Sequence, residues 1–158
     1  MRRSISAVNS SRPTRASRST FTVQTFIETL PLNTNDATID TIKQIDVLRL
    51  RRGSIVRAFE VEHTTAVYSG LLRMADLLAP QPNIDIRLHI VASDERRDKV
   101  FREMARPVFM LLERGPLSES CTFISYESVE AIRSLKHLDR MNDSIVADYE
   151  EPAETSQE

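Results

Sequence analysis

The chain has 158 residues, enough for one domain with a hydrophobic core, and 41% of them are hydrophobic. Lys and Arg number 21 and Asp and Glu 23, a net charge of −2, so the whole molecule is not a basic nucleic-acid binder. Only three glycines are present, which argues against a Gly-rich phosphate-binding loop. The single cysteine, Cys121, cannot form an internal disulfide; this indicates a reducing compartment, and we expect a cytoplasmic protein. No apolar run approaches about 18 residues, so we expect no membrane-spanning helix.

Charge is distributed unevenly along the chain and divides it into three regions. Residues 1–20 are rich in Arg and Ser and contain no acid, which is typical of a disordered tail; a phosphate-contacting arm and an organelle transit peptide are the alternatives. Residues 141–158 are acidic, and we expect them to form a disordered tail. Alternatively, this tail covers a basic surface of the protein when no ligand is bound. Residues 21–140 are expected to form the folded domain.

The folded region shows alternating hydrophobic periodicities. We expect strands over 41–50 and 54–62, a helix over 66–79, a strand over 85–92, a helix from 94 to about 105, a strand over 121–125, and a helix from 126 to about 138 capped by Ser125. Residues 21–30 fit a helix or a strand, and 109–112 are ambiguous. A hairpin followed by alternating helices and strands predicts an α/β fold, with a central β-hairpin in a mixed sheet flanked by helices. Cys121 begins an apolar run and is expected in the core.

Three acids fall on the proposed hairpin. If the loop is centred on Gly53, residues equidistant from it face one another, and Asp46 and Glu60 are such a pair. Glu62 follows Glu60 by two residues and so points to the same face of the strand. The three carboxylates are therefore predicted to converge, although a slip of one residue would turn Asp46 to the other face.

Such a cluster needs compensating positive charge. Burying three like charges costs several kcal/mol, and a hard divalent ion such as Mg²⁺ or Mn²⁺ would offset that cost through oxygen ligands. The alternative from the residues alone is pairing of the acids with Arg49, Arg57 or Arg73 at an edge of the sheet.

These residues resemble a known pattern. Asp46, a hairpin turn and then Glu60-Val61-Glu62 are similar to the signature of the PD-(D/E)XK superfamily of restriction-endonuclease-like nucleases. The run 59–77 resembles the strand-to-helix junction of a group of bacterial restriction-like domains, and the likeness continues through 90–97 and Arg106-Pro107. The resemblance covers roughly residues 38–138 and implies a restriction endonuclease-like core, which normally begins with a helix before the hairpin.

The resemblance also implies roles for the acids. Asp46, Glu60 and the backbone carbonyl of Val61 would hold Mg²⁺ or Mn²⁺, and DNA, rather than RNA, would be the substrate of phosphodiester hydrolysis. Glu62 occupies the position at which the family usually has Lys, and it would position or deprotonate the attacking water. This departure leaves a second reading open: a catalytically inactive nuclease-like module that binds DNA or a protein partner.

Residues beside the acids are expected to contact DNA. Arg49 near the hairpin tip suits a phosphate contact, and an exposed charged turn is its alternative. Thr64 and Thr65 can cap the following helix or bind phosphate at its N-terminus. Arg73 on that helix could reach the acidic centre and stabilise phosphate charge, or pair with Asp76 instead. Restriction-like nucleases often work as dimers, so a homodimer is a further expectation; a regulatory α/β domain without nucleic acid is a third function class.

Overall fold

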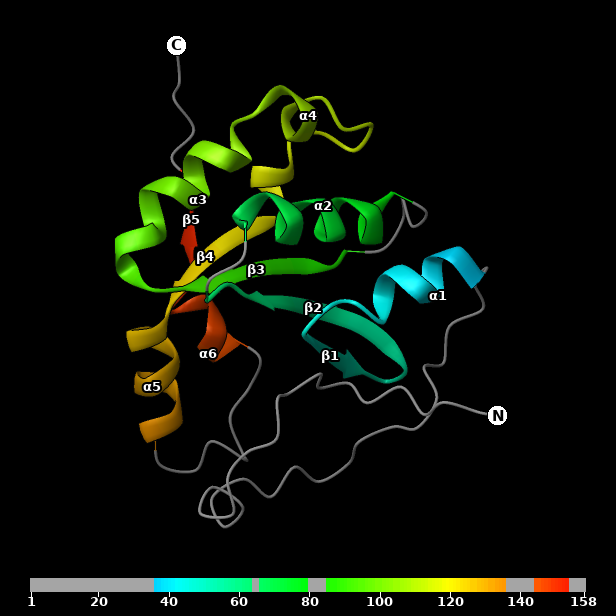
Figure 1. Ribbon diagram of the computed structural model, residues 1–158. Coiled ribbons are helices and arrows are strands. Elements are labelled where there is room, and N and C mark those ends of the chain that lie inside the picture. Colours follow the sequence, from blue (N-terminus) through cyan, green and yellow to red (C-terminus); the bar gives the residue numbers. More distant parts are fainter. Residues whose placement is uncertain (1–35, 64–65, 80–84, 136–143, 154–158) are drawn as a thin grey trace.

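The computed structural model describes residues 36–63, 66–79, 85–135 and 144–153 (Figure 1). Eight longer elements form its body: α1 (Asp36–Ile42), β1 (Val47–Arg51), β2 (Ser54–Val61), α2 (Val67–Leu78), β3 (Arg87–Ala92), α3 (Arg97–Met104), β4 (Cys121–Ser125) and α5 (Tyr126–Ser134). Shorter elements complete it: η2 (Asp94–Arg96), α4 (Pro107–Met110), η3 (Leu117–Glu119), α6 (Ser144–Ala147) and β5 (Glu151–Pro152).

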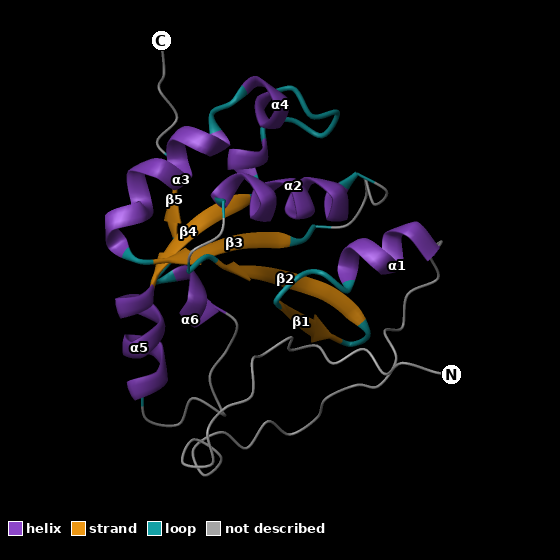
Figure 2. Ribbon diagram, in the orientation of Figure 1, coloured by secondary structure: helices purple, strands orange, loops and turns teal. Residues whose placement is uncertain are grey.

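The strands form one five-stranded sheet in the order β1-β2-β3-β4-β5. The three central strands run parallel, and each edge strand runs antiparallel to its neighbour. Helices lie on both sides of this mixed sheet (Figure 2). The predicted α/β class is confirmed, and the arrangement is compatible with a restriction endonuclease-like fold.

The two faces of the sheet bury unequal cores. The larger core lies under α1 to α4 and includes Leu71 and Met74 of α2, Ile90 of β3 and Phe123 of β4. A smaller cluster on the other face brings Val146 of α6 against the sheet. Among the described helices, none is long and apolar enough to cross a membrane.

The hairpin confirms the predicted register near the acids. Val47 pairs with Phe59, which is the pairing expected for a loop centred on Gly53. Closer to the turn the register shifts by one residue, because Arg51 pairs with Ser54 and an irregularity follows Arg49. The turn itself is Arg52-Gly53, and both residues have positive φ (52° and 82°), as a tight two-residue turn between twisted strands requires. The bulge adds one unpaired residue to β2, so beyond it the pairs from Arg49 back to Val47 have the register expected for a loop centred on Gly53.

The beginning of the first expected strand is wrong. Residues 41 and 42 end α1, and β1 starts at Val47, so Asp46 immediately precedes the strand. Sequence propensity favoured a strand because the segment is rich in β-branched residues. Their spacing also suits a helix: Ile39 and Ile42 are three residues apart on one side, and Ile42 is buried in the core. Helix α1 thus precedes the hairpin, where the resemblance implies a helix.

Most downstream elements lie where periodicity predicts them. Helix α2 and strand β4 fall within one residue of their expected bounds, and the expected helix from 94 divides into η2 and α3. Ser125 caps α5, since its hydroxyl accepts a hydrogen bond from the Ser128 N–H at 3.0 Å. Cys121 is fully buried, as expected. The ambiguous segment forms α4 and its exit, whereas residues 1–20 and 21–30 lie outside the described residues.

The structure places residues 144–153 against the sheet, although the sequence assigns them to an acidic tail. Strand β5 pairs with β4, with Glu151 opposite Phe123. Glu150 forms ion pairs with Arg57 at 3.0 Å and Arg87 at 3.3 Å. These acids are neutralised by arginines from distant parts of the chain, so acidic composition alone did not indicate how this segment folds.

Candidate functional site

The acidic cluster lies where β2 ends beneath α2. Glu60 on β2 is fully buried, and Glu62, the first residue after the strand, is 1% exposed. The Glu62 N–H donates to the Val91 carbonyl of β3 at 2.8 Å, which fixes the backbone there. Asp46, just before β1, accepts a hydrogen bond at 2.8 Å from the Val61 N–H. The hairpin and its neighbouring strand therefore hold all three acids at one end of the sheet.

Arg73 reaches this cluster from α2. Its Nε donates to Glu60 Oε1 at 3.0 Å, and its Nη2 donates to Glu60 Oε2. The same Nη2 lies 3.8 Å from Glu62 Oε1. Within the described ranges, the ion pairs of Arg73 are with these two acids and not with Asp76. Of the three arginines that the sequence offered as partners for the acids, Arg73 is the one that lies against Glu60 and Glu62.

Burial and the neighbouring charges shift the pKa values of Glu60 and Arg73. Burial raises the pKa of Glu60 above its usual value, the Arg73 hydrogen bond and charge oppose that rise, and the charges of Asp46 and Glu62 add to it. The pKa of Arg73 is raised, chiefly by its hydrogen bond to Glu60. The guanidinium is therefore permanently charged. It stabilises the ionised form of Glu60, which burial destabilises.

Gly70 gives Glu62 its space. A Cβ at this position of α2 would lie 2.5 Å from Glu62 Oε1, closer than such atoms approach one another. Glycine inside a helix costs about 1 kcal/mol relative to alanine. Gly70 and Arg73 are one turn apart on α2, so one helix face supplies both the space and the positive charge for the acids.

Two side chains hold the backbone after β2. Arg96 Nη1 donates to the carbonyls of Glu62 and His63, each at 3.2 Å. The Tyr126 hydroxyl is 2.9 Å from the Glu62 carbonyl and 2.8 Å from His63 Nδ1. Burial is the main cause that raises the pKa of Tyr126, so its hydroxyl keeps its proton for donation at neutral pH. The segment carrying Glu62 is thereby anchored from two further elements.

No group of three or more His, Cys, Asp or Glu side chains is arranged to hold a metal ion in the part of the chain that the structure describes. The acids nevertheless present only oxygen donors, and Mg²⁺ typically takes one or two carboxylates with water and phosphate oxygens. The donor chemistry of these acids suits such an ion, and in this arrangement a guanidinium contacts both oxygens of Glu60.

Comparisons with known proteins relate the chain to a restriction enzyme family. The family model of the type II restriction enzyme NmeDI C-terminal domain matches residues 15–153. The chain belongs to this family. The type II restriction enzyme NmeDI of Neisseria meningitidis serogroup C is 40% identical over 104 residues, which are 63% of this chain and 27% of that enzyme. The chain thus matches about a quarter of the length of this relative, and no solved structure matches it.

The structure separates the residues predicted to contact DNA in this family member. Arg73 lies at the acids, as described above. Arg49 pairs directly with Arg57 across the hairpin, which places both on the face of the sheet opposite Glu60. Thr64 and Thr65 lie outside the described residues, so their predicted contacts stay predictions.

Sequence reasoning missed Gly70, Arg96 and Tyr126. The sequence placed Arg96 and Tyr126 only in the first turns of two expected helices and gave neither a role at the acids. A signal existed in the topology: β2, β3 and β4 are parallel, so residues that follow their carboxyl ends meet at one edge. The strand order, which brings these ends together, is not readable from a single sequence.

A second polar cluster lies on the opposite face and has a structural role. Arg57 is 4% exposed, and its Nη1 donates to His89 Nε2 at 2.8 Å and to Glu150 at 3.0 Å. His89 Nε2 therefore accepts, and its Nδ1 carries the proton at 2.7 Å from Thr122 Oγ1. Phe59 stacks on the imidazole with ring centroids 4.6 Å apart. This network fastens the C-terminal segment to the sheet.

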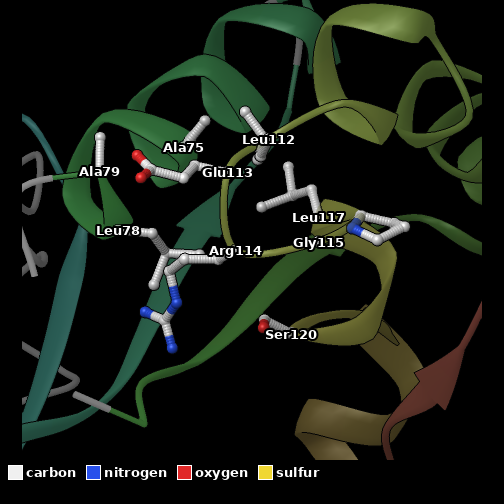
Figure 3. A pocket seen from close by; sticks show the side chains of 10 residues that line it. Ala75, Leu78, Ala79, Leu112, Glu113, Arg114, Gly115, Leu117 and Ser120 are labelled. Atoms are coloured by element: carbon white, nitrogen blue, oxygen red, sulfur yellow. The ribbon is translucent and has the colours of Figure 1, made fainter. Parts of the chain in front are cut away.

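A pocket of about 430 Å³ lies at the other end of α2 (Figure 3). Leu78, Leu112 and Leu117 provide apolar lining, and Glu113 and Arg114 lie beside them. None of the lining residues belongs to the acidic cluster. The hollow is therefore separate from the candidate site, whose assignment rests on its side chains.

Proposed function

We propose that this domain is a Mg²⁺- or Mn²⁺-dependent nuclease of the PD-(D/E)XK type that hydrolyses phosphodiester bonds in DNA. The observation that carries the proposal is the buried Glu60, with Glu62 beside it and Asp46 tied to the same strand end. Membership of a type II restriction enzyme family supports DNA over RNA as the substrate. Homodimer formation would be one way to cut both strands of a duplex.

Asp46, Glu60 and the carbonyl of Val61 would hold the ion. When bound, such an ion would polarise the scissile phosphate and stabilise charge in the pentavalent transition state. The fit rests on the oxygen donors of these residues and on the placement of a cation, the guanidinium of Arg73, against Glu60.

The chain's own groups would then orient the reactants. Glu62 is anchored through its backbone by Val91, Arg96 and Tyr126, and its buried carboxylate lies beside Arg73 and Gly70 of α2. A carboxylate held in this way can accept a proton from a water aligned with the phosphate, the task that the family usually gives to Lys. Arg73, 26% exposed, could contribute positive charge to the phosphate from the α2 side.

A catalytically inactive module that binds DNA or a protein is the second candidate function. The bidentate contact of Arg73 with Glu60 favours it, because the carboxylate is neutralised without any metal ion. Glu62 also favours it, because the PD-(D/E)XK pattern usually has a water-activating Lys at that position and a carboxylate stands there instead.

A cleavage assay with a matched set of variants separates the two candidates. Supercoiled plasmid is incubated with the full chain in Mg²⁺ or Mn²⁺, with EDTA as the blank. We expect Asp46→Asn and Glu60→Gln to reduce cleavage at least about 100-fold, because each would lose a ligand of the ion. Glu130→Gln, which removes an exposed carboxylate from α5, should leave cleavage unchanged. Equal cleavage by all variants would refute the active site, and DNA binding without any cleavage would support the inactive module.

A further inference from the structure

The cation at the acidic cluster is part of the chain. The guanidinium of Arg73 contacts both oxygens of Glu60 and approaches Glu62 Oε1 at 3.8 Å. It also lies close enough to Asp46 for that charge to act on it. One side chain therefore offers positive charge to all three acids from a single position.

The charges of this cluster do not cancel. When all are ionised, three carboxylates and one guanidinium leave a net charge of −2, which one divalent cation would balance. A guanidinium binds carboxylates through directional N–H groups, whereas Mg²⁺ and Mn²⁺ bind the same oxygens as ligands. Arg73 and a divalent ion therefore require the same electron pairs of Glu60.

We propose that Arg73 is an exchangeable internal cation, which neutralises Glu60 in the metal-free protein and competes with the divalent ion for it. The inference rests on the metal site of the proposed function, but it concerns a property of this chain. A divalent ion would enter only as the guanidinium gives up its contacts with Glu60. Arg73 has a route for this movement, since its side chain is 26% exposed while Glu60 is fully buried.

The exchange would set the metal affinity of the site. A single charge within about 4–6 Å changes the proton affinity of a carboxylate about 10- to 1,000-fold, and a divalent ion carries twice the charge of a proton. Removing the guanidinium should therefore strengthen metal binding at least about tenfold. It should also destabilise the metal-free fold, because Glu60 would keep its burial and lose its bonded partner.

Calorimetric titration with Mn²⁺ tests this without any cleavage reaction. The full chain, Arg73→Gln and Arg133→Gln are titrated at the same pH and ionic strength. Arg133 is a remote, half-exposed arginine of α5, so its variant makes the same change in net charge away from the acids. We expect Arg73→Gln to bind Mn²⁺ at least about tenfold more tightly than wild type, and Arg133→Gln to match wild type. Equal or weaker binding by Arg73→Gln would overturn the exchange.

Two further variants keep the test decisive. Arg73→Lys retains a positive charge without the bidentate fork, so its affinity should lie between those of wild type and Arg73→Gln. Thermal unfolding in EDTA should show a lower midpoint for Arg73→Gln, and Mn²⁺ should raise that midpoint by more than it raises the wild-type one. If Arg73→Gln does not fold, Arg73→Lys decides: an affinity no higher than that of wild type would overturn the exchange.

Glu60→Gln distinguishes the two levels of inference. If this variant binds Mn²⁺ as well as wild type does, the metal site of the proposed function fails and the exchange fails with it. If Glu60→Gln loses binding while Arg73→Gln gains none, the metal site stands and only the exchange is wrong.

Discussion

Gly70→Ala offers the sharpest test of the packing between α2 and the acids. In wild type the new methyl group would lie 2.5 Å from Glu62 Oε1, so the carboxylate would have to move. Overpacking of this kind costs about 1–3 kcal/mol. Replacing glycine in the helix returns about 1 kcal/mol of propensity. The expected net effect lies between no change and a loss of about 2 kcal/mol of unfolding free energy, because the regained helix propensity offsets part of the overpacking cost.

The same substitution should change sign when Glu62 is shortened. In a Glu62→Ala background the obstructing oxygen is gone, and Gly70→Ala should then stabilise the protein by about 1 kcal/mol through helix propensity alone. The double-mutant cycle should give a coupling energy of about 1–3 kcal/mol, which is the overpacking cost itself and lies within the range that contacting residues show.

Urea denaturation followed by far-UV circular dichroism supplies the four free energies, and it suits a chain without tryptophan. Stabilisation by about 1 kcal/mol in both backgrounds would refute the reasoning, because Glu62 would then not lie against α2.

Three further predictions concern the scaffold. Ser125→Ala should cost about 1 kcal/mol by removing the cap of α5, whereas Ser134→Ala at the exposed end of that helix should cost little; equal effects would contradict the cap. Glu150→Gln should lower the unfolding free energy by about 3 kcal/mol, because its partner Arg57 is buried. Glu151→Gln should lower it by less than about 1 kcal/mol, because its partner Arg97 is 37% exposed. Urea titration compares the two variants, and a larger loss for Glu151→Gln would contradict the buried ion pair of Glu150. Burial raises the pKa of the Cys121 thiol, and the thiolate is the reactive form, so alkylation of the native protein should stay slow as the pH is raised to about 9. Unfolded protein should react rapidly. Mass spectrometry measures the extent of alkylation, and fast labelling of the native protein would show that the thiol is accessible.

The parallel part of the fold was predictable because its signals are local. Strand β4 is a short apolar run followed by a capping serine, and α2 has one continuous apolar face. The hairpin register was also predicted correctly beside the acids, although by a simplified route. The real turn is Arg52-Gly53, and the bulge after Arg49 supplies the residue that a loop centred on Gly53 had assumed.

The parts that the sequence did not predict depend on distant contacts. Glu150 binds Arg57 across 93 positions of the chain, so the C-terminal segment looked like an acidic tail until its partners were placed. Helix α1 was hard to predict for another reason. β-branched residues favour strands on average, and the burial of Ile42 in the larger core, which favours the helix, depends on residues distant in sequence.

The site was half predictable for the same physical reason. Asp46, Glu60 and Glu62 could be related through one hairpin, whose geometry follows from alternation and a turn. Arg73 could be assigned to α2, but two partners were open to it, because its position over the sheet depends on how α2 packs. Once that packing is known, Arg73 is seen to lie beside Glu62 and to oppose its charge. The carboxylate of Glu62 adds negative charge to the cluster, and α2 supplies the guanidinium of Arg73, which offsets part of it. Under the proposed mechanism Arg73 has to yield Glu60 to a metal ion, because a guanidinium that keeps both oxygens of Glu60 leaves that carboxylate unable to serve as a ligand.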